Sequence, residues 1–332
     1  MVETTLQLCF ALNDHCIVTQ FLLVPLHCRK CNNGEYEDRL SDLPDSVILH
    51  ILSFLNTKDV VRTCVLSRRW KDIWKHIPTL IFNSSRFDTV RQFEIFMSKI
   101  MTLRDNTTAL HSLDFDHMGK MEHQLLQKIL SYVYSHNTKL QQLRIFVHND
   151  NGLIMQCVSS CQYLTSLKLS IYPRISFCSH TIFPKSLNLP ALEMLDISNF
   201  TFYGGENGVA EPFSAFTKLK SLIIRGCKVM DTQMINISSE TLVNFAMHYS
   251  SSKIAKIELS TPSLCTFTFY GIPCQKIYGS YLSSVKEVNI YAHMDRYLEN
   301  LPMVLFNWLQ DLSGVKSLKV SSITLQVYLG MI

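Results

Sequence analysis

Apolar residues follow helical spacing over a short segment that begins at Pro44. Proline is tolerated at a helix start because the N–H that it lacks has no helical partner there, and Asp45 and Ser46 supply acidic and capping groups to the first turn. Two apolar stripes then lie on different faces of this helix. They are Ile48, Leu52 and Leu55, and Val47, Ile51 and Phe54. A helix that is apolar on two faces needs more than one partner surface.

Two more short helices are predicted before Pro78. Asn56 or Thr57 can cap the second helix, and Ser67 can cap the third. The apolar residues of the third helix recur at i, i+3, i+4 and i+7 and are Trp70, Ile73, Trp74 and Ile77. Three helices in about forty residues are near the lower size limit of a stable domain. An apolar face that this unit leaves uncovered therefore indicates a surface for a partner.

From Leu110 onward, a different apolar pattern repeats about every 20 to 30 residues, which is typical of a solenoid. The repeat units are Leu110-Leu113-Phe115, Leu140-Leu143-Ile145, Leu164-Leu167-Leu169, Leu192-Leu195-Ile197, Leu219-Leu222-Ile224, Leu242-Phe245-Met247, Leu264-Phe267-Phe269, Val285-Val288-Ile290 and Val315-Leu318-Val320. Alternating apolar residues in each unit predict a short inward-facing strand, and successive strands predict a curved parallel sheet. The segment from Met121 to Tyr134 predicts an amphipathic helix on the convex side.

The helical segment resembles an F-box. The matching residues are Leu43-Pro44, Ile51 to Leu55, Asp59 to Thr63, Val65 to Trp70, and Trp74. Together with the repeats, the chain resembles the plant F-box proteins that carry leucine-rich repeats. The implied fold class is α/β, with a three-helix F-box at residues 39–80 and an irregular leucine-rich-repeat solenoid with a curved parallel sheet at 81–332. Residues 1–38 are expected to be a poorly ordered leader, and the solenoid is expected to be truncated at its C-terminus.

In that family the F-box packs on a Skp-type adaptor, which joins a cullin-RING ubiquitin ligase, and the remainder of the chain holds the substrate. The resemblance implies a substrate-recognition subunit of an SCF-type ligase, located in the nucleus or the cytoplasm. Residues that would form or support the adaptor surface are Leu43, Pro44, Ile48, Ile51, Leu52, Leu55, Leu66, Trp70 and Trp74. For Ile73 and Ile77, packing of the helices on one another is the expected role.

Strand residues that alternate with the inward apolar ones should face outward on the concave surface. The substrate-binding candidates among them are Arg144, Phe146, Lys168, Asp196, Arg225, His248, Tyr270, Asn289 and Tyr291. Aromatic residues and Arg are enriched at protein contact sites. The alternative is that these positions are simply the polar face of a solvated sheet.

Composition excludes several other classes of protein. The chain is 47% hydrophobic and 17% charged, which indicates a folded protein. Its net charge of +4 is scattered, which argues against a nucleic-acid partner. The 11 cysteines are irregularly spaced, and copies such as Cys157, Cys161, Cys227 and Cys265 predict buried free thiols in a reducing compartment. No stretch reaches the roughly 18 uninterrupted apolar residues of a membrane helix.

We expect no enzyme activity, catalytic site, cofactor or metal. The sequence contains no phosphate-cradling glycine loop, no nucleophile elbow and no paired-histidine metal motif. A lone CxxC at Cys28 and Cys31 has no second pair at zinc-finger spacing.

Other functions remain open at the level of the sequence. Four glycosylation sequons, at Asn83, Asn106, Asn199 and Asn236, favour a secreted or cell-surface repeat protein. The abrupt end of the repeats, without a polar capping unit, favours a truncated receptor that binds the adaptor without productive ubiquitination. A repeat protein that binds other proteins outside any ligase is the remaining alternative.

Overall fold

A computed structural model describes residues 42–119, 122–136, 138–148, 153–172, 181–185, 187–249, 254–273, 275–292, 301–312, 314–321 and Thr324. The chain forms two compact units, Met1–His117 and Met118–Ile332. The predicted leader at 1–38, with its CxxC, and the C-terminal segment 325–332 lie outside the described residues. The described part of the chain contains no helix that is long and apolar enough to span a membrane.

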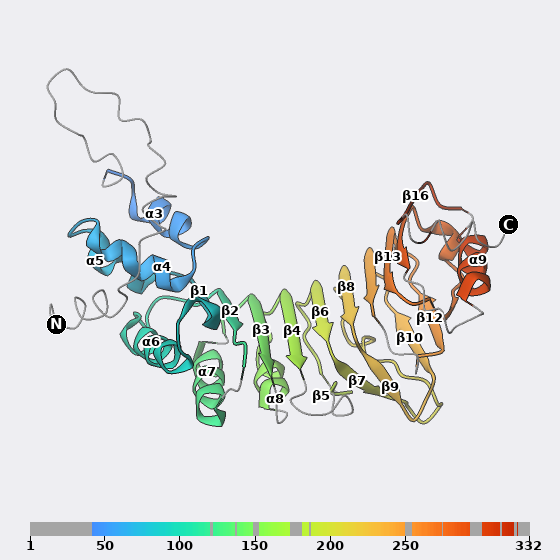
Figure 1. Ribbon diagram of the computed structural model, residues 1–332, viewed down its shortest axis with the longest axis horizontal. Helices are drawn as coiled ribbons and strands as arrows, with labels where there is room; N and C mark the ends of the chain where they lie inside the picture. Colours follow the sequence, from blue (N-terminus) through green and yellow to red (C-terminus); the bar gives the residue numbers. More distant parts are fainter. Residues whose placement is uncertain are drawn as a thin grey trace, which may run out of the picture. The chain divides into compact units, whose positions relative to one another are not determined.

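The described part of the first unit begins with short helices, as predicted (Figure 1). They are α3 (Asp45–Leu52), α4 (Thr57–Arg62) continued by the 3-10 turn η1 (Thr63–Val65), and α5 (Trp70–Ile73) continued by η2 (Trp74–His76). Asn56 caps α4, because its side chain accepts a hydrogen bond from the Lys58 N–H at 2.9 Å. The third helix is shorter than predicted, since Ile77 is extended at φ −67° and ψ 133°. Pro78 disfavours the helical conformation at the residue before it.

A parallel strand pair completes the first unit. The elements are β1 (Thr79–Asn83), η3 (Ser84–Arg86), α6 (Val90–Leu103) and β2 (Ser112–Asp116). Thr89 caps α6, and the helix buries its apolar face, which includes Phe93, Phe96 and Ile100. The side chains of Leu80 and Phe82 in β1 are also buried, so the strand pattern begins one unit earlier than the sequence analysis predicted.

The second unit is built on one long parallel sheet, the main sheet, whose strands lie side by side in Figure 1. In spatial order they are β3 (Gln142–His148), β4 (Ser166–Tyr172), β6 (Met194–Ser198), β8 (Ser221–Arg225), β11 (Asn244–His248), β13 (Thr266–Gly271), β15 (Glu287–Ala292) and β16 (Ser317–Val320). In every predicted repeat unit from Leu140 onward, the last two apolar residues lie in one of these strands. Together with the helical module, this sheet confirms the predicted α/β fold class.

A second layer covers one face of the main sheet. Its helices are α7 (His123–His136), α8 (Leu153–Ser159) and α9 (Leu301–Asp311). The buried side chains of α7 are Leu125, Leu126, Ile129, Leu130 and Val133, which confirms the predicted amphipathic helix.

In the middle repeats this layer consists of short parallel strands, which the sequence analysis did not predict. One set is β5 (Thr181–Ile182), β7 (Phe200–Tyr203) and β9 (Lys228–Met230), and the other is β10 (Met234–Ser238), β12 (Lys256–Ser260) and β14 (Lys276–Tyr278). Buried phenylalanines pack around the first set, with Phe183 edge-on to Phe200, Phe202 and Phe213 at centroid distances of 5.6 to 5.9 Å. These rings fill the core between the two layers.

A left-handed residue marks the end of four aligned strands at one register position, directly after β6, β8 and β11 and as the last residue of β13. These residues are Asn199 (φ 64°), Gly226 (φ 57°), Tyr249 (φ 47°) and Gly271 (φ 131°). The Asn199 N–H donates to Arg225 O at 2.8 Å, and the Gly226 N–H donates to His248 O at 2.9 Å. The main-chain ladder thus extends one residue beyond the strands before the chain turns away.

The described cysteines are free thiols. Cys64, Cys157, Cys161 and Cys227 are buried, and Cys265 is half-buried. Burial raises the pKa of Cys227 to about 12, so this thiol stays protonated at neutral pH. Burial is therefore confirmed for three of the four cysteines named from the sequence and is only partial for Cys265.

Candidate functional sites

The short helices of the first unit bury some predicted adaptor residues and expose others. Ile48, Leu52, Trp70 and Trp74 are all in the core of the first unit. Their side chains therefore pack inside the unit and are not part of its surface. Ile73 and Ile77 are buried too, in the packing role expected for them. Leu43, Ile51 and Leu55 are half-buried and Pro44 is exposed.

Apolar side chains that reach solvent come from α3, the turn after it, and the end of η1. Phe54 is 73% exposed, Val65 67% and Leu66 48%, and Val47 is exposed as well. Of these four, only Leu66 was among the predicted adaptor residues. The second apolar stripe of the first helix already contained Val47 and Phe54, so the sequence did carry the signal for them. Where large exposed apolar side chains form one contiguous patch, they indicate a contact site for another protein.

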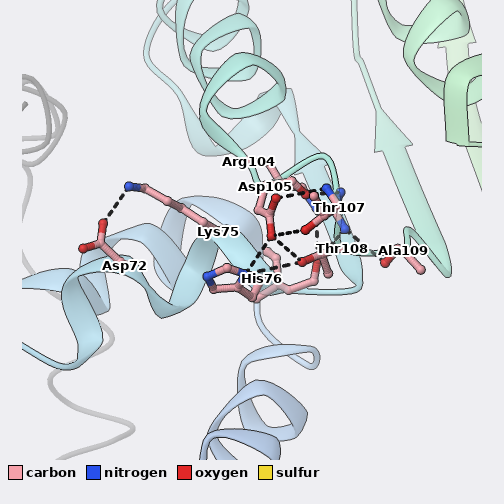
Figure 2. Close-up of polar contacts among 9 residues, drawn as sticks. Asp72, Lys75, His76, Arg104, Asp105, Thr107, Thr108 and Ala109 are labelled. Carbon is pink, nitrogen blue, oxygen red and sulfur yellow. Dashed lines mark hydrogen bonds and ion pairs between the residues drawn. The ribbon is translucent and has the colours of Figure 1, made fainter.

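Hydrogen bonds join the end of the third helix to the loop between α6 and β2 (Figure 2). Arg104 is only 2% exposed. Its guanidinium donates to Ile77 O from Nε at 3.1 Å and from Nη2 at 3.0 Å, and to Ala109 O from Nη2 at 3.1 Å. The Asp105 N–H donates to Lys75 O at 3.0 Å. These bonds join the last residues of the F-box to the strand pair.

Asp105 organises the same loop (Figure 2). Its carboxylate accepts bonds from the Thr107 N–H at 3.0 Å and from the Thr107 hydroxyl at 2.7 Å. It also lies 3.2 Å from His76 Nδ1. Hydrogen bonds from Thr107, assisted by Thr108 and His76, lower the pKa of Asp105 from 3.8 to about 2. From the sequence, this loop was noted only for the sequon at Asn106, and the role of Asp105 was not identified.

A second anchor joins α4 to β1. The Thr57 side chain is fully buried, and its hydroxyl accepts a hydrogen bond from the Ile81 N–H at 2.8 Å. The next residue, Lys58, donates to Arg86 O at 2.7 Å and lies 4.5 Å from the centre of the Phe87 ring. The F-box helices and the first strand therefore share one hydrogen-bonded core.

On the main sheet, the face opposite the second layer, here called the open face, carries all of the predicted substrate candidates. Strand register places them in two rows. The first row is Arg144, Lys168, Asp196, Ile223, Ala246, Thr268, Asn289 and Lys319. The second row is Phe146, Ser170, Ser198, Arg225, His248, Tyr270 and Tyr291.

A charged cluster, formed by Lys168, Asp196 and Arg225, lies on strands β4, β6 and β8. Lys168 Nζ is 3.2 Å from Asp196 Oδ2, and Arg225 Nη1 donates to Asp196 Oδ1. Beside it, the buried hydroxyls of Ser170 and Ser198 are hydrogen-bonded to each other at 3.2 Å.

An aromatic ladder of His248, Tyr270 and Tyr291 continues the second row. The His248 and Tyr270 rings stack at 4.9 Å, and the Tyr270 and Tyr291 rings stack at 4.2 Å. Burial, and then the positive charge of Arg225, lower the pKa of His248. Desolvation, and then Tyr291, raise the pKa of Tyr270. Both side chains are therefore neutral at pH 7.

A smaller aromatic group lies on the first two strands of the main sheet. Phe146 and His148 lie 5.1 Å and 5.5 Å from the Tyr172 ring. Tyr172 and His148 were not among the substrate candidates, because each lies two residues beyond the last outward-facing residue counted in its repeat. Strands β3 and β4 are longer than most of the others, and this extra length brings both residues onto the sheet.

Comparison with known proteins identifies the helical part of the first unit. The F-box domain family matches residues 40–82. The chain carries an F-box domain. Similar proteins from Arabidopsis thaliana include F-box/FBD/LRR-repeat protein At5g44980, 27% identical over 87% of this chain and 68% of its own length. F-box/LRR-repeat protein 13 is 26% identical over 70% of this chain and 50% of its own length. The resemblance to plant F-box/leucine-rich-repeat proteins is thereby confirmed, and the chain spans between half and about two thirds of the length of these relatives.

Proposed function

We propose that the chain is a substrate-recognition subunit of an SCF-type ubiquitin ligase, acting in the nucleus or the cytoplasm. In this proposal the F-box docks on a Skp-type adaptor and the open face of the main sheet binds the target protein. The observation that carries it is the F-box unit itself, whose core is filled while Phe54, Val65 and Leu66 project into solvent.

The free energy gained by burying apolar surface favours a protein partner that covers these side chains. Removing apolar surface from water contributes about 25 cal/mol per Å², so each exposed side chain gains from being covered. The filled core gives them no place inside the unit. An adaptor that covers Phe54, Val65 and Leu66 provides the missing burial.

Catalysis in this proposal comes from proximity. The receptor supplies no nucleophile or base and holds the target beside the ubiquitin-loaded enzyme, which raises the effective concentration of the reacting groups. Two surfaces on one chain are sufficient for this role.

A matched pair of substitutions tests the adaptor surface. We expect Phe54→Asp and Leu66→Asp each to abolish co-purification with a Skp-type adaptor, because a charge would have to be desolvated in the contact. Ile95→Asp is the control, since Ile95 is an α6 side chain that is 48% exposed, like Leu66, but lies outside the F-box. Undiminished adaptor binding by Leu66→Asp, or an equal loss with Ile95→Asp, would contradict the proposal.

Burial of one sequon argues against the alternative that the chain is a secreted or cell-surface glycoprotein. A glycan is attached at the side-chain nitrogen, and the Asn199 Nδ2 atom is buried. Asn199 also occupies the left-handed position after β6. In the folded chain there is no room for a glycan on this buried nitrogen.

A further inference from the structure

The charged cluster on the open face extends the proposed function and rests on it. Its three residues come from neighbouring strands. Lys168 and Asp196 are register partners, and Arg225 is the partner of Ser198, two residues along β6 from Asp196. The carboxylate therefore has one cation on each side.

Burial differs sharply within the cluster. The Asp196 side chain is 6% exposed, whereas those of Lys168 and Arg225 are 43% and 33% exposed. Both oxygens of the carboxylate are engaged, one by each cation. The cluster consequently has two positive charges and one negative charge, and its excess positive charge is on the side that reaches solvent.

Arg225 also has spare hydrogen-bonding capacity. A guanidinium carries five N–H donors. Within the described residues, its hydrogen bond to Asp196 uses Nη1 alone. The remaining donors, on a side chain already held in place, suit a charge-assisted bond to an oxyanion. Because Asp196 orders both cations before any ligand arrives, binding costs less side-chain entropy.

The neighbouring surface suits a polypeptide. His248 is the register partner of Arg225 and begins the aromatic ladder. The ladder side chains are half-buried, and aromatic residues at this level of exposure are typical of protein contact sites. A peptide lying across the strands can contact the cluster and the ladder together.

We propose that Lys168 and Arg225, held by Asp196, bind an anionic group of the substrate polypeptide, either a carboxylate or a phosphate monoester, while the aromatic ladder contacts the adjoining residues. The charge of the cluster selects the anion, and the ladder adds contact area beside it. This assigns a class of substrate segment, acidic or phosphorylated, to the open face.

Binding of degenerate peptide mixtures to the immobilised full-length chain tests the proposed anion site. Four mixtures are identical except for the central residue, which is glutamate, glutamine, phosphoserine or serine. We expect retention of the glutamate or phosphoserine mixture about tenfold above its neutral counterpart, as one charge-assisted hydrogen bond provides. The glutamate and phosphoserine pairs distinguish the two sources of the anion.

Substitutions test whether the preference for anionic peptides depends on Lys168 and Arg225. Arg225→Gln and Lys168→Gln should each abolish it, and Arg225→Lys should keep part of it. Lys319→Gln is the matched control, because Lys319 lies in the same row but pairs with Glu287 at 2.9 Å. Lys168 is the more exposed of the two cations, so Lys168→Gln tests the site even where Arg225→Gln impairs folding.

The results separate this proposal from the ligase assignment. Equal retention of charged and neutral mixtures, an equal loss with Lys319→Gln, or preference for a single-stranded oligonucleotide over every peptide would overturn the anion site. Adaptor binding is measured on the same preparation. Adaptor binding without anion preference would refute this inference alone, whereas anion preference without adaptor binding would refute the ligase assignment alone.

Discussion

At the scale of single residues, a buried cation and a low-pKa carboxylate hold the F-box to the strand pair of the first unit. Arg104 donates to main-chain oxygens of Ile77 and Ala109, and Asp105 ties down the loop that follows. Buried carbonyl oxygens need such partners, because an unsatisfied one costs about 1–3 kcal/mol. Neither residue follows an apolar pattern, and for that reason periodicity could not identify them.

The Asp105 carboxylate predicts a specific dependence of stability on pH. Its pKa is about 2 in the folded chain, against an ordinary value of 3.8, so its contribution is complete above pH 3.8 and is lost as the pH falls towards 2. Asp105→Asn should therefore lower the urea midpoint of the first unit at pH 6, and the difference from wild type should narrow between pH 4 and pH 2. Asp88→Asn, at an exposed aspartate of the same unit, is the control. A difference that stays constant over this range would contradict the assignment.

At the scale of elements, the strands of the main sheet and their turns differ in how well sequence predicts them. Alternating apolar residues located β2 and each strand of the main sheet, because burial on one side of a strand imposes a two-residue period. The same spacing in Ile77, Leu80 and Phe82 marks β1, but Ile77 also continued the helical pattern of Trp70, Ile73 and Trp74. Pro78 disfavours the helical conformation at Ile77, so Ile77 follows the strand pattern and not the helical one.

The short strands of the second layer lacked a comparable signal. A strand such as β9, Lys228–Met230, is too short to show a period. Its conformation depends on pairing with β7, a contact between distant parts of the sequence. Local patterns do not contain that information.

Gly226 tests the turn that follows the strands. Alanine there would adopt a left-handed conformation, at a cost of about 1–2 kcal/mol, and its Cβ would lie 2.7 Å from Asn199 Oδ1. We expect Gly226→Ala to lower the urea midpoint of the second unit more than Gly208→Ala does. Gly208 is also left-handed, at φ +73°, but has no atom within 4 Å of its added Cβ. Equal effects of the two substitutions would show that the contact with Asn199 is unimportant.

At the scale of the whole molecule, the chain combines two units with different surfaces. Residues 40–82 of the first unit match the F-box domain family, and the unit exposes apolar side chains. The second unit presents charged and aromatic residues in register on a parallel sheet. Sequence patterns predicted both architectures, and every substrate candidate lies on the open face. The pairing of Asp196 with two cations, and the spare donors of Arg225, required the side-chain geometry.

Hydrogen–deuterium exchange of the full chain, with and without a Skp-type adaptor, tests the central claim most directly. We predict that the adaptor slows exchange in peptides that cover residues 47–54 and 65–66 and leaves β8, β11 and β13 unchanged. Slowed exchange on those strands, or none in the F-box peptides, would contradict the account.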